Sequence, residues 1–116
     1  TPGHTPGVMS MLFSVKDDDS NHQAFLFGGH NVTSNRVEDF ELFIPAVERM
    51  QRELDNVEVN LTSHPWASLI FQRAERLMQR QSGEAHPFVD GEDFIEFLNE
   101  RLVNARQRLA LARGSE

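Results

Sequence analysis

The sequence predicts an α/β fold with the element order ββαβαα. Three short segments are apolar or alternate between apolar and polar residues, which is typical of strands. Three longer segments carry apolar residues at steps of three and four, which is typical of amphipathic helices. Strands mixed with one-sided helices imply a sheet covered by helices. The 116 residues suffice for one small domain, so residues 1–116 are treated as a single unit.

The first two strands are expected to form a hairpin. In residues 8–16 apolar side chains alternate with other residues, namely Met9, Met11, Phe13 and Val15. Aspartates 17–19 should form a solvated hairpin tip, because they lack the spacing and the terminal glutamate of a calcium loop. Residues 22–28 contain a short aromatic run that predicts a buried strand.

Two helices and the third strand follow the hairpin. Residues 37–54 predict a helix, and Pro45 is expected to kink it or split it in two. Residues 57–63 alternate cleanly and predict a strand. Residues 67–81 predict a second helix. Its inner face should carry Ile70, Ala74, Leu77 and Met78.

The last helix is expected to begin after Asp90 and to run to about Arg113. Asp90 can cap its first turn, with Asp93 at the third helical position.

Composition excludes several classes of function. The net charge is −7 and Lys16 is the single lysine, which argues against nucleic acid and anionic membranes as partners. No apolar run is long enough to span a bilayer. We therefore expect a soluble protein, with the cytoplasm as the favoured compartment. The chain has no cysteine, so any metal would be held by His, Asp or Glu.

Two histidines are candidate metal ligands. His4 lies between two Thr-Pro-Gly segments, and such a rigid loop would fix its imidazole in one orientation, as a short Zn–N bond requires. A disordered Pro/Gly-rich terminus is the alternative. His64 follows a predicted strand, and α/β proteins commonly place their sites at the carboxyl ends of strands. The alternative for His64 is a hydrogen bond to a backbone carbonyl.

The other three histidines carry weaker expectations. His30 follows two glycines and could approach a ligand, although a turn histidine is favoured. His22 follows the acidic turn and should be solvated. His86 precedes Pro87 in a loop and is expected to be structural or exposed.

Taken in order, these features resemble the metallo-β-lactamase superfamily. Residues 1–7, Thr-Pro-Gly-His-Thr-Pro-Gly, look like the tail of its third metal-binding motif. A hairpin, a Gly-Gly strand exit at 28–29 and a helix follow, and residues 62–65, Thr-Ser-His-Pro, then end a strand. The later Pro-Phe-Val at 87–89 is most similar to the third subclass and its relatives. The resemblance covers nearly the whole chain and implies the C-terminal half of an αββα sandwich.

The resemblance implies that His4 would bind a first zinc ion and His64 a second. Two histidines are fewer than the three protein ligands of a typical catalytic zinc site. The family's His-x-His-x-Asp-His motif supplies most ligands from upstream, and this sequence has no such run. We therefore expect that the N-terminal metal-binding half is absent. The complete protein would hold one or two zinc ions, and this chain alone could hold none.

A second departure from the family concerns Gly29. Many members carry a bridging Asp or Cys at the corresponding position, and glycine has no side chain that could bridge metals. Whether His30 takes over this part is left open by the sequence.

The function implied by the resemblance is zinc-dependent hydrolysis. A metal-activated hydroxide would attack a β-lactam, lactone or other ester-like bond of a small molecule that the sequence does not identify. The chain is then a fragment, inactive without its N-terminal half. The alternative is a non-catalytic α/β interaction module that self-associates through an incomplete sheet. Either hypothesis predicts a partner, which is the missing half or a second copy in a homodimer.

Overall fold

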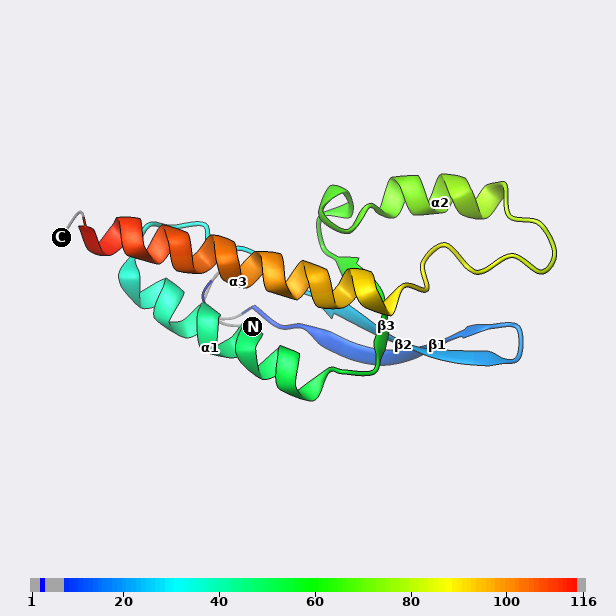
Figure 1. Ribbon diagram of the computed structural model, residues 1–116, viewed down its shortest axis with the longest axis horizontal. Coiled ribbons are helices and arrows are strands. Elements are labelled where there is room, and N and C mark those ends of the chain that lie inside the picture. The colour runs from blue at the N-terminus through cyan, green and yellow to red at the C-terminus, as the bar shows by residue number, and fades with distance from the viewer. Residues whose placement is uncertain (1–2, 4–7, 115–116) are drawn as a thin grey trace.

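The computed structural model describes residue 3 and residues 8–114 of the chain. Its elements follow the predicted order ββαβαα, with one added 3₁₀ turn (Figure 1). The strands are β1 (Met11–Asp17), β2 (Ser20–Phe27) and β3 (Val57–Thr62). The helices are α1 (Val37–Glu53), the 3₁₀ helix η1 (Pro65–Ser68), α2 (Ile70–Met78) and α3 (Gly91–Gly114).

The three strands form one sheet in the order β1-β2-β3. β1 and β2 pair antiparallel as the predicted hairpin, and Asp18 at its tip has a left-handed φ of 52°. β3 returns through α1 and pairs parallel with β2. The carboxyl ends of β2 and β3 therefore meet at the same edge of the sheet, which is the edge that carries the candidate site.

One face of the sheet is covered by α1 and α3, which lie side by side (Figure 1). Phe25 and Phe27 of β2 point into this core, where Phe27 is 0% exposed. The ring of Phe27 packs against those of Phe43 and Phe97, with centroids 6.3 Å from each. Phenylalanines thus join the sheet to both helices in the dry centre of the molecule.

The opposite face of the sheet is also apolar but is only partly covered. Side chains alternate along a strand and paired residues share a face, so one row of residues points away from α1 and α3. This row, called here the outer face, consists of Met11, Phe13, Ala24, Leu26, Val59 and Leu61. Ala24 and Val59 are buried, whereas Met11 and Phe13 of β1 are 52% and 36% exposed.

The second helix differs from the prediction. Leu69 has a left-handed φ of 58° and separates η1 from α2, so the segment 67–81 is not one helix. The predicted inner face is wrong for Leu77 and Met78, which are 37% and 90% exposed, whereas Ile70 and Ala74 are half-buried. Instead Arg73 is buried. The physical reason is that α2 lies apart from the α1–α3 pair (Figure 1), where the phenylalanine core does not reach it.

The first helix is not split by Pro45. α1 runs without interruption from Val37 to Glu53. Proline removes the hydrogen bond to the carbonyl of Glu41 one turn earlier. Both residues are exposed, so water can solvate that carbonyl. No helix within residues 8–114 is long and apolar enough to cross a membrane.

The N-terminus of α3 follows the prediction. The backbone N–H of Asp93 donates to Oδ1 of Asp90 at 3.1 Å, so Asp90 caps the helix.

Candidate metal-site edge

The carboxyl ends of β2 and β3 bring two histidines together. His30 follows β2 by three residues and His64 follows β3 by two. Their rings pack edge to face with centroids 5.7 Å apart. His30 is buried and 6% exposed, whereas His64 is exposed. The sequence predicted His64 at this edge and left the part of His30 in metal binding undecided. The structure places the two histidines next to each other.

Glycines shape the exit from β2. A Cβ atom at Gly28 would lie 2.0 Å from the carbonyl oxygen of Met9, so no other residue fits there without a backbone shift. Gly29 is buried with a left-handed φ of 67°, which disfavours any side chain. The backbone conformation thus explains why residue 29, where a metal-bridging side chain was considered, is a glycine.

Two arginines of α3 hold the loop that carries His30. Arg101 donates from Nη1 to Oδ1 of Asn31 at 3.1 Å. Arg108 donates to the carbonyls of Val32 and Ser34 at 2.6 and 2.9 Å. Each guanidinium also lies over a phenylalanine ring of the core. These contacts fix the loop after β2 to the rigid α1–α3 layer.

A buried hydroxyl pair holds the turn that carries His64. The hydroxyl of Thr62 donates to the carbonyl of His64 at 2.6 Å, and it lies 2.9 Å from the hydroxyl of Ser68. The backbone N–H of Ala67 also donates to the carbonyl of His64 at 3.0 Å. The backbone on both sides of His64 is thereby tied to the end of β3.

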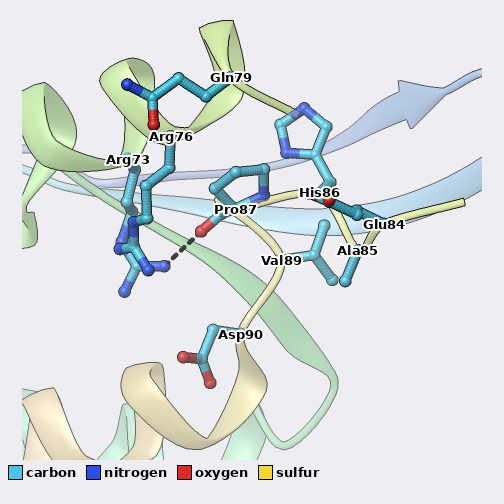
Figure 2. A pocket seen from close by; sticks show the side chains of 9 residues that line it. All are labelled: Arg73, Arg76, Gln79, Glu84, Ala85, His86, Pro87, Val89 and Asp90. Atoms are coloured by element: carbon cyan, nitrogen blue, oxygen red, sulfur yellow. Dashed lines mark hydrogen bonds between the residues drawn. The ribbon is translucent and has the colours of Figure 1, made fainter. Parts of the chain in front are cut away.

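Arg73 extends this support from α2. Its Nε donates to the carbonyl of Ser68, its Nη1 donates to the carbonyl of Pro87 at 2.6 Å, and its Nη2 lies 2.9 Å from Oδ2 of Asp93. Figure 2 shows this side chain reaching across the hollow between α2 and residues 84–90. The hollow measures about 430 Å³, but its buried cation is engaged by protein groups. Arg73 therefore joins η1, the 84–90 segment and α3.

The sequence reasoning missed these three arginines. Arg101 and Arg108 contact residues 70 to 76 positions away, a relation that local patterns do not contain. Their spacing of seven residues, two helical turns on one face of α3, is the signal that could have singled them out. Arg73 likewise falls among apolar residues of α2.

The remaining predicted residues lie elsewhere or outside the described part. His4 is outside the described residues. Its neighbour Gly3 packs against α1, where a Cβ would lie 2.5 Å from Cβ of Phe43. His22 is not solvated as expected, because its Nδ1 contacts a carboxylate oxygen of Glu58 on the next strand. His86 is structural, since its ring accepts a hydrogen bond from the backbone N–H of Phe88.

The acidic turn is only partly solvated. Asp17 forms a two-pronged ion pair with Arg80, at 3.1 and 3.2 Å, which ties the hairpin to the end of α2. The hydrogen bonds from Arg80 hold the pKa of the Asp17 carboxyl below its ordinary value of 3.8. The expectation of a freely solvated tip is therefore wrong for Asp17, whereas Asp18 and Asp19 are exposed.

His30 and His64 fit part of a zinc site. Imidazole nitrogens are common zinc donors, but catalytic sites use three protein ligands. Among residue 3 and residues 8–114, no group of three or more His, Cys, Asp or Glu is placed to hold a metal. The described residues therefore do not form a metal site by themselves, although His30 and His64 lie together at this edge.

Comparisons with solved structures identify the fold. The chain is similar to the subclass B3 metallo-β-lactamase BJP-1 of Bradyrhizobium japonicum, with 21% identity and a TM-score of 0.75 over 99% of this chain. The native FEZ-1 metallo-β-lactamase from Legionella gormanii gives 22% identity and a TM-score of 0.78 over 97%. The class B3 di-zinc metallo-β-lactamase LRA-12 from an Alaskan soil metagenome gives 16% and 0.62 over 93%.

Each of these structures is much longer than the matched region. The chain spans 42 to 44% of their lengths. No protein-family model and no curated protein matches the sequence. The match of nearly this whole chain to less than half of each neighbour agrees with the predicted C-terminal half. The chain therefore has the fold of part of a metallo-β-lactamase domain.

Proposed function

We propose that this chain is the C-terminal half of a zinc-dependent hydrolase, in which His64 is a zinc ligand and the remaining ligands come mainly from an N-terminal half. The observation that carries the proposal is the meeting of His30 and His64 at the carboxyl ends of two parallel strands. It occurs in a chain that has less than half of a metallo-β-lactamase fold. His4, whose motif resembles that family, is proposed as a second ligand.

The chain's own residues hold His64 and its neighbour His30 in place. Thr62 and Ser68 fix the His64 turn, and Arg101 and Arg108 fix the loop of His30. Such support matters because a misplaced imidazole lowers metal affinity. When bound, zinc would supply the Lewis acidity that activates water and polarises the scissile carbonyl.

The partly covered outer face supports the need for an N-terminal half. Met11 of this face and Met9, just before β1, are more than half exposed at the β1 edge of the sheet. An open edge and an apolar face favour association with further chain. We propose that the N-terminal half covers this surface and brings its metal ligands to the edge with His30 and His64.

The proposed substrate is a small molecule with a β-lactam, lactone or other ester-like bond. The support is the name that the similar structures share, metallo-β-lactamase. Fold likeness alone does not choose among these bonds.

The same exposed β1 surface favours a second candidate function. The chain would then be a non-catalytic module that pairs with a second copy through this edge. Light scattering separates the two, because a compact monomer that becomes a one-to-one complex with the N-terminal half contradicts self-association.

Zinc analysis tests the proposed function. The chain is purified alone and together with the polypeptide encoded upstream of it, and the zinc content of each is measured. We expect one or two zinc ions in the pair, far less than one in the chain alone, and hydrolysis only by the pair. A pair without zinc would contradict the proposal.

A further inference from the structure

We infer that Trp66 is a specificity-determining residue that forms an apolar wall beside the zinc site and contacts a planar or apolar substituent of the substrate. The inference rests on the proposed function and concerns a residue to which the sequence reasoning assigned no part. Trp66 is the single tryptophan of the chain.

The position of the indole carries the inference. The rings of Trp66 and His64 are stacked, with centroids 4.6 Å apart and planes at 27°. Stacking uses the face of the imidazole, whereas the ring nitrogens coordinate in the ring plane. The indole can therefore stay against His64 while His64 binds a metal. A substrate whose reacting bond is held at that metal would then have the indole within reach of its neighbouring substituents.

The indole also has solvent-exposed surface that a ligand can contact. Trp66 is 66% exposed although one face of its ring lies against His64. Large aromatic side chains bind flat apolar groups by offset or edge-on packing. An exposed indole next to a metal ligand is thus suited to recognise an aryl or alkyl group near the scissile bond.

The turn around Trp66 is held firmly enough to make such a wall. Trp66 lies in η1, which begins at Pro65 and is followed by Leu69 with its left-handed backbone. The buried Ser68 accepts from Arg73 at its carbonyl and contacts Thr62 through its hydroxyl. A preorganised side chain loses little freedom when a ligand binds.

Phe71 provides a matched control. It is an aromatic residue of the same region, 67% exposed, on α2. It shares the exposure of Trp66, and its ring is not stacked on His64. A general effect of removing an exposed aromatic side chain would therefore be seen at both positions.

The test uses the complete protein, with its N-terminal half and zinc, and two pairs of substrates. Benzylpenicillin is compared with 6-acetamidopenicillanic acid, which differs by loss of the phenyl group. Phenylacetyl-homoserine lactone is compared with acetyl-homoserine lactone in the same way. We expect Trp66→Ala to raise KM for the phenyl member of the hydrolysed pair about three- to tenfold, with kcat and zinc content unchanged. The KM of the acetyl member should stay the same.

Two further variants sharpen the result. Trp66→Phe keeps a ring and should restore most of the affinity for the phenyl compound, and Phe71→Ala should match the wild type. Equal changes for both members of a pair, no change in KM, or a fall in kcat together with zinc loss would overturn the inference. In the last case Trp66 merely supports His64.

Failure of the proposed function looks different. A wild-type protein that binds no zinc, or hydrolyses neither pair, overturns that function and this inference with it. A wild-type protein that is active while Trp66→Ala behaves like it overturns only the inference about Trp66.

Discussion

The two faces of the sheet are built from similar residues but differ in what covers them. On the inner face Phe25 and Phe27 pack against α1 and α3, and Phe27 is 0% exposed. On the outer face Phe13 of β1 remains 36% exposed and Met11 remains 52% exposed. The inner face is thus a finished core at β2, whereas Leu12 of the edge strand β1, which pairs with Phe25 and shares this face, is 51% exposed. The outer face has the composition of a core but is covered only in part, because Ala24 and Val59 are buried while Met11 and Phe13 are exposed.

This difference explains how so small a chain can position His30 and His64, the two histidines at the proposed site. The finished inner face gives β2, β3 and α3 a rigid frame, and the loops of His30 and His64 are tied to it. The outer face is where we propose that the rest of the fold packs. Mutations on the inner face should therefore lower the stability of the chain itself, whereas mutations on the outer face should act mainly through the proposed partner.

The largest expected effect is on the inner face. Phe27→Ala removes a fully buried ring that packs against three other rings, so it should lower the free energy of unfolding by about 3–5 kcal/mol. Urea unfolding followed by circular dichroism measures this loss. A cost below about 1 kcal/mol would show that the phenylalanine core is not the centre of stability.

A smaller effect is expected where α2 is anchored. Arg73→Met leaves Asp93 and two backbone carbonyls without their cation, at a cost of about 2–3 kcal/mol. The cost is below that of a fully buried pair because the side chain of Asp93 is 30% exposed. In the Arg73→Met variant, the backbone amides of η1 and α2 should exchange with solvent faster than those of α1. Arg76→Met, an exposed change on the same helix, is the control, and equal destabilisation by the two variants would contradict the anchor.

On the outer face the effect should depend on the partner. Phe13→Ala should cost about 1 kcal/mol in the chain alone, because the side chain is already partly exposed. With the N-terminal half bound, the same change should cost about 2–3 kcal/mol, since the ring would then be buried. The two unfolding curves are compared with those of Phe27→Ala, which should cost the same in both states. A cost for Phe13→Ala that the partner leaves unchanged would argue against packing on this face.

The smallest effect concerns pH. The pKa of Asp17 is lowered in the folded state by Arg80, so its stabilising contribution is present above the ordinary value of 3.8. It is lost as the pH falls from there through the lower pKa of the folded state. The stability gap between the wild type and Asp17→Asn should therefore be constant near neutral pH and close in acid. Asp19→Asn in the same turn is the control, and a gap that widens in acid would contradict the pairing with Arg80.

The elements that could be predicted from the sequence are those whose pattern and cover agree. β2, β3, α1 and α3 have periodic apolar residues that contribute to the buried core. β1 was also predicted correctly, from its alternation and its hairpin turn, although its apolar residues are largely exposed. α2 has the same kind of period, but its apolar residues are left largely exposed and Arg73 is buried instead. A periodic pattern shows that a face is apolar, and it does not show whether this chain covers that face.

The candidate site was predictable only in part, for a related reason. His64 could be singled out because a strand end is a local feature that places residues at a known edge. Its nearness to His30 depends on the parallel pairing of β2 with β3, which forms across an intervening helix. The supporting arginines act over still longer separations in the chain. Long-range contacts of this kind follow from the fold and not from a short motif.

The most direct test of the account is the zinc content of the complete protein after His64→Ala. We expect this variant to lose at least one zinc ion per molecule relative to the wild type, because the second ion depends on that imidazole. His86→Ala, which removes a loop histidine bonded to the backbone N–H of Phe88, should retain the full zinc content. A His64→Ala protein that is folded and carries as much zinc as the wild type would contradict the account.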